Sequence, residues 1–155
     1  MNKFGFRVAL LGLLVAFSAP VVAQAAEADD AIKYRKWVMG TVGDHTQAFF
    51  AILQGKVPHQ DALVYHAQAL ADAAAHTKAA FEQNTAGEGS EKTTAKASVW
   101  DGPDFNAGLD SLATNTAALA AAMAAGDMAA VGAAAGAVGK DCKTCHDSFR
   151  VEGTH

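Results

Sequence analysis

The chain has few cysteines and prolines and no clear β-strand pattern. Its 155 residues include two cysteines, Cys142 and Cys145, and three prolines. Two cysteines without a second pair leave the four ligands of a structural zinc site incomplete. A disulfide between residues three positions apart would close a tiny loop and would restrain the unfolded chain little. A thioredoxin-like redox pair is expected near a βαβ unit, and no strand signal supports one.

Positive charge is also scarce. Twelve Lys and Arg residues stand against sixteen Asp and Glu residues, and two of the twelve, Lys3 and Arg7, lie in the first 25 residues, which contain no acid. The rest of the chain is therefore net negative, with no basic stripe or stacking platform, which argues against nucleic acid as a partner. No constellation of catalytic acid, base and nucleophile is visible, so we do not expect an enzyme.

The N-terminal segment has the pattern of a secretory signal peptide. Basic Lys3 and Arg7 precede an apolar run over residues 8–17, and Ala23-Gln24-Ala25 has the small-x-small form of a cleavage site. The apolar run is short for a membrane span, and acidic residues follow it, which disfavours a membrane anchor. We expect residues 1–25 to be a cleaved signal peptide, residues 26–155 to form one domain, and the product to be periplasmic without membrane attachment.

Four segments of the remaining chain have helical periodicity. Mostly apolar residues, expected to face the core, recur at alternating steps of three and four over residues 30–53, 58–83, 104–125 and 128–149. Gly55 and Gly126 end the first and third segments, and Asp127 is placed to cap the fourth. Residues 84–103 lack periodicity and form the one long connection. This pattern predicts an all-α fold, an antiparallel four-helix bundle.

The fourth segment contains both cysteines, in the sequence Cys142-Lys143-Thr144-Cys145-His146. C-x-x-C-H is the haem attachment spacing, in which two thiols bond to the vinyl groups and the adjacent imidazole becomes an axial iron ligand. The sequence therefore predicts one haem c, covalent through Cys142 and Cys145, inside the bundle. The expected buried stripe of this helix comprises Met128, Val131, Ala135, Val138, Cys142, Cys145 and Phe149, and His146 borders it.

Three glycines in the same helix allow more than one interpretation. Gly132, Gly136 and Gly139 each cost helix propensity of about 1 kcal/mol relative to Ala. Their small size would admit a flat macrocycle or a close helix neighbour. A merely weak helix is an equally good interpretation.

Three stretches resemble the class II cytochromes c, and most closely the cytochrome c′ family. The motif lies almost at the C-terminal end, whereas class I cytochromes c carry it near the N-terminus, with a Met ligand far downstream. The resemblance covers essentially the whole chain after the signal peptide. The matching stretches are Tyr34-Arg35-Lys36-x-x-Met39, Trp100-Asp101-x-Pro103-x-Phe105 and Cys142-Lys143-x-Cys145-His146-Asp147-x-Phe149-Arg150.

The resemblance implies roles for six residues. Cys142 and Cys145 would hold the haem by thioethers, and His146 would be the proximal iron ligand. Arg35 would lie near a haem propionate, and Met39 would occupy the distal side. The spacing agrees in part, because these two residues are four apart and share a helix face. The sixth residue, close to the proximal ligand, would be Arg150.

Met39 allows two coordination states. In cytochrome c′ an apolar side chain at this position shields a five-coordinate iron, which implies binding of small diatomic gases such as nitric oxide and carbon monoxide. In low-spin relatives resembling cytochrome c556, a Met is the sixth ligand, which suits electron transfer with a redox partner protein. The resemblance favours the first state. His45, His66 and His76 are weaker alternatives for the sixth ligand, because helical histidines are more often surface or core residues.

Two aromatic residues of the first segment lie off its buried stripe. Trp37 and Phe50 would therefore be exposed, and exposed aromatics on a helix can mark a contact with a second copy. The resemblance to cytochrome c′ implies the same arrangement. We expect a homodimer.

Overall fold

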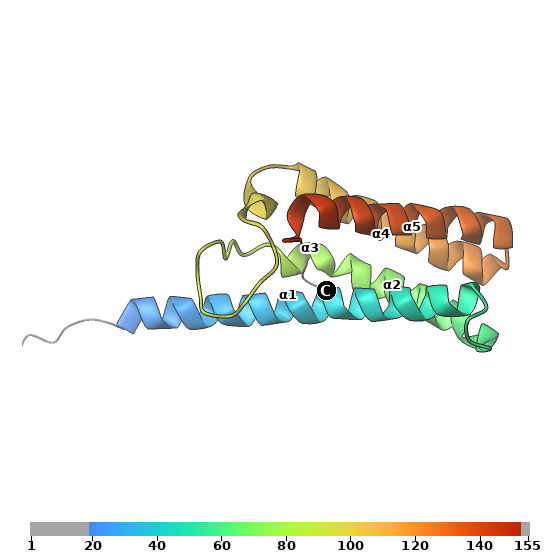
Figure 1. Ribbon diagram of the computed structural model, residues 1–155, viewed down its shortest axis with the longest axis horizontal. Helices are drawn as coiled ribbons and strands as arrows, with labels where there is room; N and C mark the ends of the chain where they lie inside the picture. Colours follow the sequence, from blue (N-terminus) through green and yellow to red (C-terminus); the bar gives the residue numbers. More distant parts are fainter. Residues whose placement is uncertain (1–18, 153–155) are drawn as a thin grey trace, which may run out of the picture.

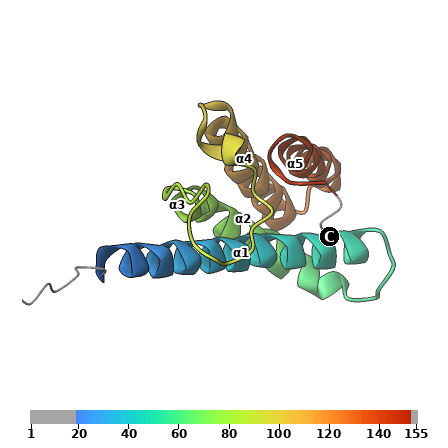
Figure 2. The same cartoon turned by 60° about the vertical axis from the view of Figure 1, so that its left-hand side comes forward.

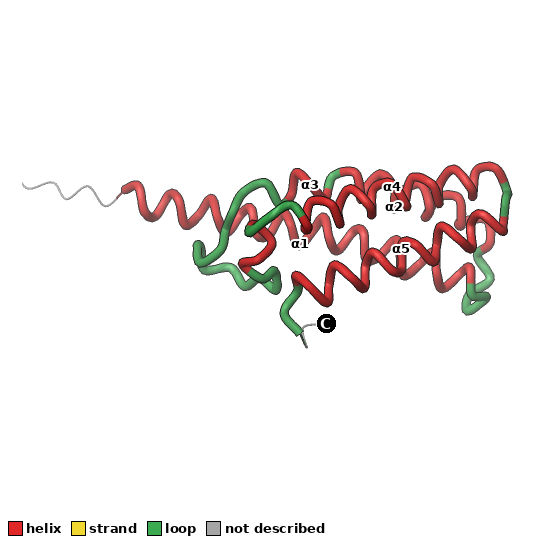
Figure 3. Tube along the Cα trace, turned by 90° about the horizontal axis from the view of Figure 1, so that it is seen from above, coloured by secondary structure: helices red, strands yellow, loops and turns green. Residues whose placement is uncertain are grey.

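The computed structural model describes residues 19–152, which form an antiparallel bundle of helices without a strand (Figure 1). Figures 1 and 3 show α1, the α2–α3 pair, α4 and α5 running side by side in alternating directions. The predicted all-α four-helix bundle is confirmed. In chain order the elements are α1 (Ala19–Leu53), the 3₁₀ turn η1 (Gln60–Ala62), α2 (Leu63–Ala75), α3 (Thr77–Ala80), the 3₁₀ turn η2 (Ala97–Trp100), α4 (Asp104–Ala125) and α5 (Met128–Phe149).

The first helix is longer than the periodicity predicts. It begins at Ala19 rather than Asp30. Pro20 lies in its first turn, where N–H groups have no acceptor within the helix, so the N–H that proline lacks is not needed there. Its N-terminal part projects beyond the other helices (Figure 2). Most of the predicted signal peptide, residues 1–18, lies outside the described residues. Between residues 19 and 152, no helix is long and apolar enough to cross a membrane.

The turn between α4 and α5 has the predicted capping residues. Gly126 adopts a left-handed conformation with φ of 70°, and the N–H of Asp127 donates to the carbonyl of Ala122 at 3.1 Å. This closes a Schellman turn at the end of α4. The Asp127 carboxylate accepts from the N–H groups two and three residues further on, at 3.1 and 3.0 Å, and so caps α5. Gly55 ends α1 with the same φ of 70°.

The second predicted helix, residues 58–83, is shorter and interrupted. Regular α-helix starts at Leu63, breaks at His76 and ends at Ala80. The N–H of His76 donates to the carbonyl of Ala73 at 3.1 Å, an i→i+3 bond that tightens the chain. The Thr77 hydroxyl donates to the carbonyl of Ala74 at 2.7 Å and so engages the main chain at the break.

Nearly all the residues of the predicted stripes lie inside the bundle. Met128 is an exception, because it is the first residue of α5 and is 54% exposed at the end of the bundle. Phe50 is half-buried, contrary to the prediction, and its ring meets that of Phe49 edge-on at 5.8 Å. The larger core cluster comprises Val42, Phe49, Ile52, Leu63, Ala67, Leu70, Ala74, Leu112, Leu119, Met123, Val131, Ala135 and Val138.

The three glycines of α5 face outward. Gly132, Gly136 and Gly139 are exposed, and a Cβ atom added at any of them would meet no atom within 4 Å. No neighbouring helix within residues 19–152 approaches them, so close packing does not explain these glycines. The structure leaves them as residues that weaken the helix.

The long connection is fixed to α1 by Asp29. Its carboxylate accepts from the N–H groups of Ser90 and Glu91 at 2.5 and 2.7 Å and from the Ser90 hydroxyl at 2.8 Å. Gly89 has φ of 74°, and a Cβ there would clash with Asp29 Oδ1. The bond from Glu91 N–H, followed by those from Ser90, lowers the pKa of Asp29. Its contribution to stability is therefore complete above the ordinary carboxyl pKa and is lost as the pH falls through the lowered value.

The other end of the connection is fixed to α5. The N–H of Lys96 donates to the carbonyl of Phe149 at 2.9 Å, and the N–H of Val151 donates to the carbonyl of Thr94 at 2.8 Å. The Lys96 ammonium also bonds the carbonyl of Ser148 at 3.0 Å, one of the last carbonyls of the helix. We call residues 89–96 the strap, because they cross from the N-terminal part of α1 to the C-terminal end of α5.

Candidate haem-binding site

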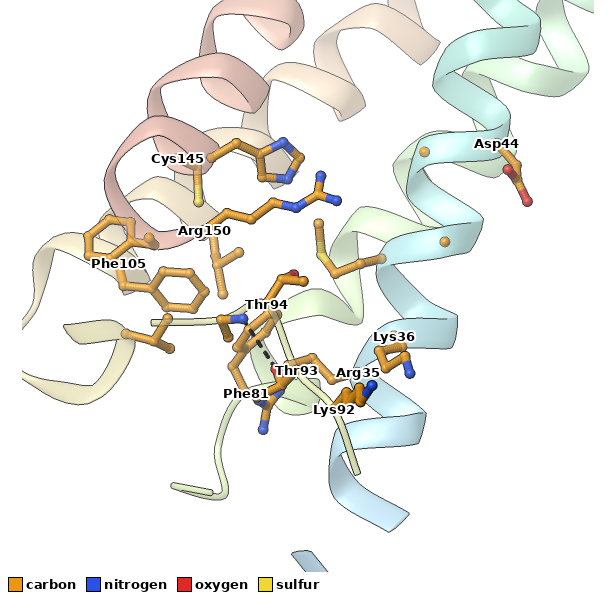
Figure 4. Close-up of a pocket in the computed structure, with 18 of the residues that line it drawn as sticks. Arg35, Lys36, Asp44, Phe81, Lys92, Thr93, Thr94, Phe105, Cys145 and Arg150 are labelled. Atoms are coloured by element: carbon orange, nitrogen blue, oxygen red, sulfur yellow. Dashed lines mark hydrogen bonds between the residues drawn. The ribbon is translucent and has the colours of Figure 1, made fainter. Parts of the chain in front are cut away.

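A cavity of about 880 Å³ lies between α1, α5 and the strap (Figure 4). This volume falls in the upper range for pockets that hold cofactors. A smaller cavity of about 200 Å³ shares Met39, Cys145 and His146 with it. The apolar wall of the larger cavity comprises Phe81, Val99, Phe105, Leu109 and Phe149.

The C-terminal part of α5 brings the motif residues to these cavities. Cys142 and Cys145 are half-buried free thiols, three positions apart on one helix face. Cys142 packs against the larger core cluster, and Cys145 packs against a second one formed by Val99, Phe105 and Leu109. Burial, the largest cause, raises the pKa of both thiols, and the negative charge of Asp141 adds to it. His146 follows directly and borders both cavities.

From the opposite side, α1 contributes Arg35 and Met39. Both line the larger cavity, as their four-residue spacing predicts. Met39 is half-buried and also lines the smaller cavity, which lies between α1, α4 and α5. Gly43, one turn further on, borders both cavities, and a Cβ there would meet nothing within 4 Å. The α1 wall is therefore open beside Met39.

Arg35 is a buried cation. Only 3% of it is exposed, and its guanidinium donates to Thr85 Oγ1 at 3.0 Å and to the carbonyl of Ala80 at 3.4 Å. Its Cζ atom lies 4.9 Å from the ring centres of both Phe81 and Trp100. Within residues 19–152, Nη1 has no hydrogen-bond partner and no carboxylate pairs with the side chain. Burial lowers the pKa of Arg35, and a buried charge without an anion is costly.

These observations fit a haem c group. Two thiols and an imidazole lie together on α5 and line the smaller cavity, and Cys145 and His146 also line the larger one with its aromatic and aliphatic wall. A haem combines an apolar ring with two carboxylates, so a buried cation with which no carboxylate of the described chain pairs suits one of them. Lys92 and Arg150 add positive charge to the lining of the same cavity.

The other histidines lie away from the cavities. His45 on α1 and His66 on α2 contact each other, with 3.1 Å between their Nδ1 atoms. Their ring centres are 5.4 Å apart, so the two rings contact each other between α1 and α2. His76 is exposed at the break between α2 and α3. None of the three lines either cavity.

The sequence did not reveal two parts of the site. One is the strap, whose Lys92, Thr93, Thr94 and Ala95 line the larger cavity, although residues 84–103 carry no periodic signal. The other is the pair of Phe81 and Trp100, which enclose Arg35 and are joined by a 2.9 Å bond from Trp100 Nε1 to the Phe81 carbonyl. A Trp in a polar connection was the available signal, because a large aromatic residue there needs a packing partner.

Known proteins match this chain over most of its length. The family described as Cytochrome C′ matches residues 30–150. Cytochrome c′ of Pararhodospirillum photometricum is 42% identical over 120 residues, which are 77% of this chain and 94% of that protein. The solved structure of cytochrome c prime from Shewanella frigidimarina superposes with a TM-score of 0.73 at 30% identity, covering 81% of this chain and 97% of that one.

A third match has a bound ligand. It is a ferrous variant of cytochrome c prime from Alcaligenes xylosoxidans with bound NO, with a TM-score of 0.69 and 28% identity, covering 81% of this chain and 96% of that one. Both the fold and the motif at the C-terminal end therefore agree with one family. The chain belongs to the cytochrome c′ family, whose members bind haem c covalently.

Proposed function

We propose that this protein is an exported mono-haem cytochrome c′ that binds nitric oxide and carbon monoxide at a five-coordinate, high-spin iron. The observation that carries the proposal is the position of Met39 and His146, which border the same two cavities from α1 and α5. A relative of similar fold binds NO. When bound, haem would supply an iron that can bind an imidazole and a small gas.

Each of the six predicted residues has a role in this proposal. Cys142 and Cys145 would hold the haem covalently, and His146 would bind its iron. Arg35 uses its buried guanidinium, with the unpartnered Nη1, to bind a propionate carboxylate. Met39 shields the iron without bonding it, and the last of the six, Arg150, lines the cavity beside His146.

The side chains of the smaller cavity favour neutral gases without a polar group. Its wall includes Val42, Leu109 and Leu112. The Thr46 hydroxyl donates to the carbonyl of Val42 at 2.7 Å, and the Gln47 amide donates to the carbonyl of Gly43 at 3.3 Å, both within α1. The Thr46 hydroxyl has no second hydrogen, so it does not offer the hydrogen bond that stabilises bound dioxygen. The Gln47 side chain is exposed and directs one of its two N–H groups to the backbone. Nitric oxide and carbon monoxide need no such donor.

Replacing Met39 tests the coordination state. We expect the ferric wild type to be high-spin and to lack the near-infrared band of sulfur-ligated iron. Met39→Ala should leave the spin state high and speed carbon monoxide binding to the ferrous protein by about tenfold, a barrier change of ~1.4 kcal/mol, because a half-buried side chain no longer blocks entry. Absorption spectra and flash photolysis measure these quantities.

The matched control is Met128→Ala, which removes an exposed methionine far from the cavities and should change neither property. The alternative function is that of a low-spin electron-transfer cytochrome, c556-like, with Met39 as sixth ligand. A wild-type spectrum with the sulfur-ligated band, lost in Met39→Ala, would establish that alternative and reject the gas-binding proposal.

Export to the periplasm is part of the proposal. The N-terminal pattern with Lys3, Arg7 and the site at Ala25 supports it, and covalent haem attachment takes place outside the inner membrane. An exported haem protein can also exchange electrons, so we include electron transfer with a redox partner protein. The acidic balance of the chain gives it an electrostatic preference for a basic partner.

We also propose a homodimer through the outer face of α1. Trp37 is 68% exposed and Tyr34 is 48% exposed on that face. Sedimentation equilibrium at tens of micromolar, an ordinary range for a specific interface, should show a dimer. Trp37→Glu should give monomers by placing a charge in the contact, whereas Met128→Glu, on α5, should not. A monomeric wild type would reject the dimer.

A further inference from the structure

Asp141 is a half-buried carboxylate that the haem motif does not include. It lies one residue before Cys142 on α5 and borders the smaller cavity together with Cys142, Cys145 and His146. We propose that the negative charge of Asp141 stabilises the ferric state of the haem iron and so lowers its reduction potential. The proposal rests on haem attachment at these two cysteines, as proposed above.

The carboxylate is fixed by neutral donors. The Ser111 hydroxyl donates to its Oδ1 at 3.0 Å, and the Asn115 amide donates to its Oδ2 at 2.7 Å, both from α4. These bonds hold the group in one place, but they carry no opposite charge that would cancel its field.

No cation of the described chain pairs with Asp141. Among residues 19–152, the ion pairs are those of Lys33, Lys36, Lys78 and Lys143 with other acids. Lys143, the next lysine along α5, bonds Asp147 at 2.6 Å, and Lys140 is exposed. The negative charge beside the motif is therefore not neutralised by a bound side chain.

The field of this charge reaches the atoms that attach the haem. Asp141 lines the same small cavity as Cys142, Cys145 and His146, so its charge lies beside the side chains that would attach the haem. A ferric iron carries one more positive charge than a ferrous iron, so a nearby anion favours the ferric form. Because Asp141 is half-buried, salt screens this interaction less than it screens a surface charge.

Asp141→Asn tests the proposal, since it removes the charge and keeps a side chain of the same shape. In a spectroelectrochemical titration, the ferrous-to-ferric ratio at a fixed potential should rise about three- to tenfold, where tenfold corresponds to 59 mV for one electron. The matched control is Asp110→Asn, an exposed residue of α4 paired with Lys78, which should change the ratio less than about twofold. The difference between the two variants should persist at ~0.5 M salt.

A second variant separates charge from tethering. Ser111→Ala breaks the 3.0 Å bond between α4 and Asp141 but leaves the carboxylate, so the potential should stay the same or fall. A rise like that of Asp141→Asn would show that the tether matters and would overturn the proposal, as would equal potentials in Asp141→Asn and Asp110→Asn. A wild type without covalent haem would instead reject the proposed function.

Discussion

The variant Cys142→Ala/Cys145→Ala is expected to contain no covalently bound haem. Each thioether holds the haem independently of the iron ligand, and these are the only cysteines of the chain. All haem should therefore leave the double variant on acid-acetone extraction, while the wild type keeps it. Cys145→Ala alone should give a poorly matured product with a single bond. Haem staining of denaturing gels and the haemochrome spectrum measure both effects.

Thr144→Ala is the control for this experiment. Thr144 lies between the cysteines and is exposed, so its replacement should leave haem content unchanged. Haem that remains with the double variant through extraction would contradict the assignment of the motif. We expect haem loss and not only weaker packing, because both thiols line a cavity and would be bonded to the haem there.

The helices were predictable where packing and local signals agree. Residues 104–125 carry a regular apolar stripe between Pro103 and Gly126, and α4 has these same bounds. Asp127 caps α5 because its carboxylate reaches N–H groups only two and three residues away. The start of α1 was not predictable from periodicity, since the helix there extends beyond the rest of the bundle (Figure 1).

The site was predictable only in part, for a similar reason. Arg35 and Met39 line one cavity because they are four positions apart on a helix, and the C-x-x-C-H spacing by itself indicates haem attachment. By contrast, the strap is held beside the cavity by its hydrogen bonds to Asp29, which is 61 positions from Ser90 in the sequence. Asp141 likewise gains its position from α4. Such contacts between distant residues have no periodic signature.

Arg35→Met is expected to destabilise the haem-bearing protein far more than the haem-free one. In the haem-bearing protein the buried guanidinium would pair with a propionate, and removing one partner of a buried pair costs about 3–5 kcal/mol. In the Cys142→Ala/Cys145→Ala background, Arg35 is a buried cation without an anion, so its removal also relieves an electrostatic penalty. There we expect a loss of less than ~1 kcal/mol. Urea unfolding of the four proteins measures the free energies.

Whether the two backgrounds lose different amounts of stability distinguishes two roles for Arg35. If the residue serves the fold alone, through its bond to Thr85 Oγ1 and its position over Phe81 and Trp100, both backgrounds lose the same stability, because these contacts do not involve haem. The control is Lys36→Met at the next residue of α1, which breaks the exposed ion pair between Lys36 and Glu91. This change should cost ~0–1 kcal/mol in both backgrounds. Equal losses for Arg35→Met would therefore reject its role as a propionate ligand, while the covalent attachment at Cys142 and Cys145 would stand.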